Sequence, residues 1–151
     1  MNRLSKIHRH VLFWTIGTLL VTGTVWALLH YLPGAIGAGE DAARAAAVWV
    51  MKLHGAAAML GLLMLGSLLP LHIKTGWQTR LNTKSGVGML LSAFLLVATG
   101  WILYYAGSES VRKAGSLVHL LLGFVLPILL PVHLARFAAR QQVESITRGL
   151  P

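Results

Sequence analysis

Two histidines that bracket an apolar segment near the carboxyl end are the first candidates for chemistry. The segment HLLLGFVLPILLPVH runs from His119 to His133 and holds no charged residue between them. Ionisable side chains are costly inside a membrane, so histidines in such a segment are candidates for a functional site. On one helix, the two rings would point within about 40° of each other and lie about 21 Å apart along the axis.

A second apolar segment carries a comparable pair, His54 and His72. Their separation of 18 residues returns them to one helix face, about 27 Å apart. If both segments cross a membrane in the same direction, His54 lies at the depth of His119, near the outer surface. Two neutral imidazoles at one depth suit axial ligation of a haem iron. The sequence therefore predicts an outer haem b on His54 and His119 and an inner one on His133.

Small and cationic residues accompany these histidines. A haem is flat and wide, so its neighbours must be small, and its propionates favour nearby cations. Glycines also let membrane helices pack closely, and the two roles are compatible. The residues predicted to support haem are Gly55, Gly61, Gly123, Lys52 and Arg136.

The composition is that of a membrane protein. The chain has 151 residues, of which 56% are hydrophobic and 11% charged, whereas about 25% are charged in soluble domains. Short connections between apolar segments favour antiparallel neighbours, which predicts a single all-α domain over 1–151, an up-down four-helix bundle. A membrane span needs about 20 mostly apolar residues. The predicted spans are 11–32, 48–73, 87–106 and 116–137.

Charge predicts the orientation of this bundle. Cytoplasmic connections of membrane proteins are rich in Lys and Arg, and here the cations gather at the amino end, the middle connection and the tail. Both termini are therefore expected to be cytoplasmic, in a multi-pass protein of the bacterial inner membrane. The formal charge of +9 does not predict nucleic-acid binding, because no basic stretch is interleaved with exposed aromatics. These cations are Arg3, Lys6, Arg9, Lys74, Arg80, Lys84, Arg136, Arg140 and Arg148.

Several motifs resemble a known group of proteins. They are the His119–His133 pair, His54 in LHGAAA, His-Arg-His before TIGTLLVTG, and the stretches PLHIKTGW and TGWILYYAG. Over nearly its whole length the chain resembles small four-helix membrane cytochromes b of the b561 or b/b6-like type. These are similar to the di-haem subunits of formate dehydrogenases and nickel–iron hydrogenases. The resemblance implies a cytochrome with two haems b that carries electrons across the membrane. Its partners would be quinone or quinol and a dehydrogenase, reductase or soluble cytochrome.

The partner of His133 has three candidates. In the family it comes from the first helix, at a histidine directly followed by Trp, but this chain has His8 and His10, with Trp14 further on. The rival is His72, which resembles the arrangement in the cytochrome b of quinol–cytochrome c reductases. His72 shares the helix face of His54, which favours it, while His8 and His10 stay open.

Two other functions compete with the cytochrome. A non-haem transport or proton-relay protein would usually recruit Asp or Glu inside the membrane, and the predicted spans hold neither. A cofactor-free membrane anchor would make the matched depths of His54, His119 and His133 a coincidence. The absence of cysteine excludes disulfides, cysteine-bound iron–sulfur clusters and c-type haem attachment. No nucleophile–base pair or phosphate loop is recognisable, so the expected role is electron transfer, alone or within a quinone-linked oxidoreductase.

Overall fold

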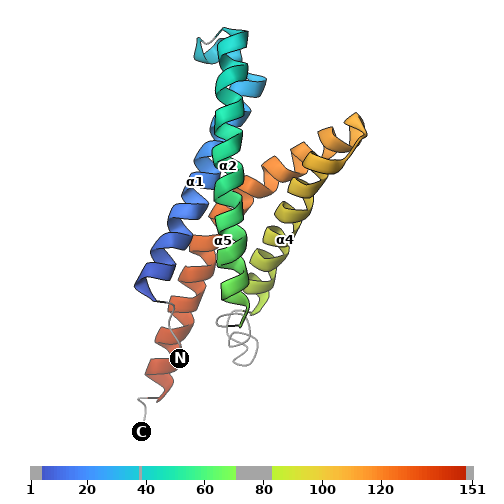
Figure 1. Ribbon diagram of the computed structural model, residues 1–151. Helices are drawn as coiled ribbons and strands as arrows, with labels where there is room; N and C mark the ends of the chain where they lie inside the picture. The colour runs from blue at the N-terminus through green and yellow to red at the C-terminus, as the bar shows by residue number, and fades with distance from the viewer. Residues whose placement is uncertain (1–4, 38, 71–82, 149–151) are drawn as a thin grey trace. The chain divides into compact units, whose positions relative to one another are not determined.

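The computed structural model describes residues 5–37, 39–70 and 83–148, and within these ranges the chain is helical with no strand. This confirms the all-α prediction. Four helices are long and apolar enough to cross a membrane, as the sequence predicts. The elements are α1 (Lys6–Tyr31), the short 3-10 helix η1 (Pro33–Ile36), α2 (Glu40–Leu68), α4 (Thr83–Tyr105) and α5 (Glu109–Arg148), drawn in Figure 1.

The helices extend beyond the predicted spans because helix formation does not stop where the apolar stretch stops. The largest difference at an amino end is in α2, which begins at Glu40 rather than at residue 48. Its first residues are mostly alanines, the best helix formers. Glu40 and Asp41 lie in the first turn, where acidic groups interact favourably with the helix dipole. Arg44 also pairs with Glu40 at 2.8 Å.

The chain divides into two compact units, Met1–Leu71 and His72–Pro151. In the first unit, α1 and α2 form an antiparallel hairpin connected through η1 (Figure 1). Gly37 follows η1 with φ of 67°, a left-handed conformation that glycine adopts without strain. In the second unit, α4 and α5 form another antiparallel hairpin. The four-helix bundle as a whole stays a prediction.

Both hairpins bury hydroxyl groups along the first of their helices. Thr15 and Thr22 are buried on α1, and Ser92 and Thr99 are buried on α4. The members of each pair are seven residues apart, so they share a helix face. A buried hydroxyl needs a hydrogen bond, and each of these donates to a backbone carbonyl one turn earlier in its own helix.

Large apolar side chains point outward instead. Trp14, Met59 and Phe94 have 76%, 70% and 65% of their surface exposed. In water such exposure would cost free energy, whereas lipid tails are as apolar as these side chains. The pattern of small polar groups inside each hairpin and large apolar groups outside suits a hairpin placed in a bilayer.

The helix α5 continues through two prolines, Pro127 and Pro131. Proline has no backbone N–H, so each one removes a hydrogen bond of the helix and favours a bend. In Figure 1 the ribbon of α5 changes direction between its orange and red parts, the stretch that holds these prolines. The helix nevertheless extends to Arg148, beyond the predicted end at residue 137.

The contact between α4 and α5 gives a stability prediction. A Cβ atom at the buried Gly115 would lie 3.0 Å from Cγ2 of Ile102, whereas one at Gly123 would meet nothing within 4 Å. We expect Gly115→Ala to be less stable than Gly123→Ala by about 1–3 kcal/mol, the usual cost of overpacking. The measurement is the thermal unfolding of each full-length variant in the same detergent. Equal unfolding midpoints would show that Ile102 moves aside without cost.

Candidate functional site

His54 of α2 is held against α1 by a threonine and the glycine that follows it. The Oγ1 atom of Thr22 lies 2.8 Å from Nδ1 of His54. A Cβ atom built on Gly23 would lie 3.4 Å from Cε1 of the same ring. The imidazole therefore rests on bare glycine backbone while its Nδ1 contacts a buried hydroxyl.

His119 of α5 is held against α4 in the same way. The Oγ1 atom of Thr99 lies 2.9 Å from Nδ1 of His119. A Cβ atom built on Gly100 would lie 3.6 Å from Cε1 of that ring. Each hairpin thus has a Thr-Gly pair on its first helix and a histidine on its second. The two predicted ligands of the outer haem have matching surroundings in separate hairpins.

The third predicted ligand, His133, repeats the arrangement further along α5. Its Nδ1 lies 2.9 Å from Oγ of Ser85, and a Cβ atom built on Gly86 would lie 3.7 Å from its Cε1. Ser85 precedes Thr99 by 14 residues, as His119 precedes His133. The antiparallel register of α4 and α5 therefore brings a hydroxyl–glycine pair to each histidine of α5.

At the corresponding end of the first hairpin the histidine and the hydroxyl residue have exchanged helices. The histidine, His8, is now on the first helix, and its Nε2 lies 3.0 Å from Oγ of Ser67 on α2. His10 is exposed and contacts its own helix, with Nδ1 2.7 Å from the backbone oxygen of Lys6. His72, the candidate that the sequence favours, lies outside the described residues.

The glycines predicted to support haem have different surroundings. A Cβ atom at Gly61 would lie 3.6 Å from both Thr15 and Leu19 of α1, which indicates close helix packing. At Gly123 the same atom would meet nothing within 4 Å. Gly55 is half-buried beside His54 in the chain. Of these, Gly61 has a packing role that its contacts account for.

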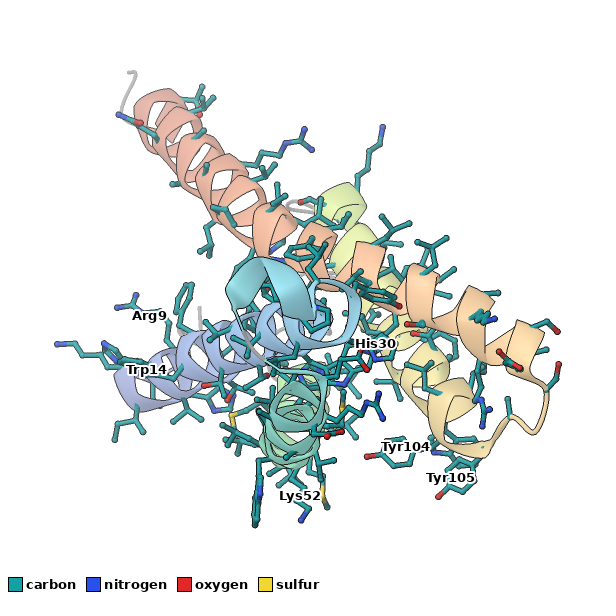
Figure 2. The ribbon with its side chains drawn as sticks, turned by 90° about the horizontal axis from the view of Figure 1, so that it is seen from above. Arg9, Trp14, His30, Lys52, Tyr104 and Tyr105 are labelled. Carbon is teal, nitrogen blue, oxygen red and sulfur yellow. The ribbon has the colours of Figure 1, made fainter. Side chains whose placement is uncertain are left out.

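The predicted cationic residues lie on the outside of their hairpins. Arg136 is exposed. The ammonium group of Lys52 lies 4.1 Å from the ring centre of Trp49, a favourable cation–π contact. Figure 2 shows Lys52 pointing away from its helix, as do Trp14, Tyr104 and Tyr105. Aromatic and long cationic side chains of this kind are typical of the membrane interface.

His30 resembles the exposed aromatic and cationic side chains rather than the histidines whose rings contact a hydroxyl. Its ring stacks on Trp26 with 4.7 Å between the centroids and meets Tyr31 edge-on at the same distance. The side chain is exposed (labelled in Figure 2). These contacts suit an interfacial aromatic group at the end of α1.

Sequence reasoning missed the hydroxyl groups that contact the histidines. A signal for them is present, because His8, Thr15 and Thr22 follow one another at intervals of seven residues. The same interval separates the hydroxyl residues of α4. In addition, each hydroxyl residue that contacts an Nδ1 atom is followed directly by glycine. The residues concerned are Thr22, Ser85 and Thr99. Ser67, which contacts Nε2 of His8, differs because the glycine precedes it in the chain.

Within the described parts of the chain, no three His, Cys, Asp or Glu side chains gather as a metal site. A haem iron with two axial histidines needs only two protein ligands, and on α5 His119 and His133 lie at separate levels, 14 residues apart. Comparison with protein-family models, curated proteins and solved structures finds no match for this chain. The geometry of the histidines therefore carries the functional argument.

Proposed function

We propose that this protein is a di-haem b-type membrane cytochrome that carries electrons across the bacterial inner membrane. In this proposal His54 and His119 hold the outer haem, and His133 holds the inner one. The observation that carries it is that each of these imidazoles contacts a hydroxyl and a glycine of the neighbouring helix. Ligating histidines usually have such a partner on the ring nitrogen that does not bind the metal.

The residues present fit the group. Each of the three rings contacts a neutral hydroxyl, which is compatible with the uncharged imidazole that axial ligation requires. Glycine beside each ring leaves room at the helix surface. Lys52 and Arg136 are proposed to face the propionates. Bound haem would supply the one-electron chemistry, while the chain would orient the ligands and surround them with apolar groups that exclude water.

The separation of the two histidines on α5 supports transfer across the membrane. Their 14 residues of helix correspond to about 21 Å, against about 30 Å for the hydrocarbon core. Two levels of ligands at this spacing lie towards opposite surfaces. One side of the relay would exchange electrons with quinone or quinol. The other side would exchange them with a protein partner, which would be a dehydrogenase, a reductase or a soluble cytochrome.

Electron transfer across vesicles tests this function. The purified full-length chain is placed in lipid vesicles that contain trapped ferricyanide, and dithionite is added outside. We expect ferricyanide inside to be reduced much faster than in vesicles without protein, measured by its loss of absorbance.

The variant His133→Ala is the control for crossing. It is expected to leave the outer ligands in place and to reduce the rate to that of empty vesicles. If the unsubstituted chain is no faster than empty vesicles although it contains haem, transfer across the membrane is wrong. A His133→Ala variant as fast as the original chain would contradict the inner site.

The partner of His133 is proposed among His72, His8 and His10. Each single alanine variant is purified, and its haem content per chain is compared with that of the unsubstituted protein. The variant of the true ligand is expected to lose the inner haem, about half of the total, because one axial ligand is missing. The other two variants are expected to retain it. If all three retain full haem content, the second inner ligand comes from another residue.

A further inference from the structure

The hydroxyl of Thr22 has its only proton engaged within α1. Its Oγ1 donates to the carbonyl oxygen of Thr18 at 2.6 Å, with that of Leu19 further away at 3.3 Å. A carbonyl oxygen accepts and cannot donate, so the proton must come from the hydroxyl. Towards His54, 2.8 Å away, Thr22 can therefore act only as an acceptor.

Thr99 repeats this arrangement in the other hairpin. Its Oγ1 donates to the carbonyl oxygen of Leu95 at 2.7 Å, with that of Leu96 at 3.1 Å. Towards Nδ1 of His119, 2.9 Å away, Thr99 can therefore also act only as an acceptor.

We infer that Thr22 and Thr99 are positioning residues that hold His54 and His119 with the proton on Nδ1. A neutral imidazole has one N–H, so a proton on Nδ1 leaves the lone pair on Nε2. In the proposed function Nε2 would bind iron, because the threonines contact the other ring nitrogen. The use of that lone pair rests on the proposed function, whereas the tautomer follows from the contacts alone.

The choice of a hydroxyl has a chemical consequence. A carboxylate acceptor on Nδ1 would raise the basicity of a ligating imidazole strongly. A neutral hydroxyl is a weaker acceptor than a carboxylate, even when its own proton is donated elsewhere. The ring therefore stays close to an ordinary neutral imidazole. Without the hydroxyl, Nδ1–H would lose this acceptor, and the preference for this tautomer over the other would weaken.

The same reasoning about hydroxyl protons and carbonyl acceptors predicts different tautomers for His8 and His10, the two candidate ligands on α1. Ser67 donates to the carbonyl oxygen of Met64 at 2.7 Å, so Nε2 of His8 must donate to Ser67, which leaves the lone pair on Nδ1. The backbone oxygen of Lys6 accepts from Nδ1 of His10, which leaves its lone pair on Nε2. Of these two residues, His10 therefore has the same tautomer as His54 and His119.

Nitrogen NMR of the full-length chain in lipid nanodiscs, prepared without haem, tests the tautomers directly. The chain is labelled with ¹⁵N in its histidine rings, because the shifts of Nδ1 and Nε2 distinguish a protonated nitrogen from one with a lone pair. Signals are assigned by their loss in His54→Ala and His119→Ala. We expect both rings to be protonated on Nδ1. Thr22→Val and Thr99→Val are expected to convert the ring that each contacts into a mixture of tautomers.

The chain offers matched controls for these variants. Thr15→Val and Ser92→Ala each remove a buried hydroxyl from the same face of the same helix, and those hydroxyls donate to Val11 and Gly88. They are expected to leave the ring signals of His54 and His119 unchanged. Rings protonated on Nε2 in the original chain would overturn the inference, as would Thr→Val variants with unchanged signals.

A second measurement distinguishes the inference from the proposed function. Protein made with ample haem is titrated for its midpoint potential, and Thr22→Val and Thr99→Val are expected to shift the potential of one haem while the control variants do not. A chain that shows the expected tautomers but binds no haem would leave the positioning of the rings established and overturn the cytochrome. If the chain binds haem but neither Thr22→Val nor Thr99→Val changes its midpoint potential or the ring tautomers, the positioning role alone is overturned.

Discussion

Replacing His119 by alanine is expected to remove the outer haem, and with it about half of the haem bound per chain. The methyl group of alanine cannot bind iron, and axial ligation by two histidines fails when one is lost. The neighbouring Thr99 and Gly100 remain in place, so the loss is confined to the ligand. Haem per chain is measured as the pyridine haemochrome of the purified variant.

His30→Ala is the matched control for this change. It also removes an imidazole, but one that is exposed and stacked on Trp26. This variant is expected to keep the full haem content. If His119→Ala keeps as much haem as His30→Ala, the assignment of His119 as a ligand is wrong.

Replacing Gly100 by leucine is expected to cause a similar loss of haem, although no ligand residue is substituted. A Cβ atom at this position would lie 3.6 Å from Cε1 of His119, which is an ordinary contact, so Gly100→Ala is expected to retain haem. The longer, branched leucine side chain would occupy the space of the ring itself. The imidazole would then leave Thr99, and the outer haem would be lost, as measured by haem content and by the spectrum of the reduced protein.

Gly88→Leu is the control on the same helix. A Cβ atom there meets nothing within 4 Å, so the added side chain is expected to be accommodated with haem retained. Haem retention in Gly100→Leu would show that His119 does not need its place against α4. Equal haem loss in both leucine variants would point to general damage to α4 and would contradict the specific contact.

The helices were predictable from the sequence because the signal is strong and local. Four apolar stretches of about the length of a membrane span predicted four helices, and the structure contains these four helices. The ends were less predictable, since EDAARAAA and the basic tail continue α2 and α5 as helix beyond the apolar limits. Those residues form helix through backbone propensity, which an apolar count does not measure.

The candidate site was predictable in its histidines and not in their partners. Ionisable residues stand out in apolar segments, whereas Thr and Ser in membrane helices are satisfied by their own backbone carbonyls wherever they occur. Thr15 and Thr22 lie on the same face of α1, and the register of α1 against α2 brings Thr22 to His54. That register depends on packing along the whole hairpin, which local spacing does not determine.

The central claim is that the chain binds two haems b, each between a pair of histidines. The most direct measurement is the haem content per chain of the purified protein, made with ample haem, together with its reduced-minus-oxidised spectrum. Two haems per chain with a b-type spectrum are the predicted result. One haem would contradict the relay across the membrane, and a chain that binds none would contradict the cytochrome altogether.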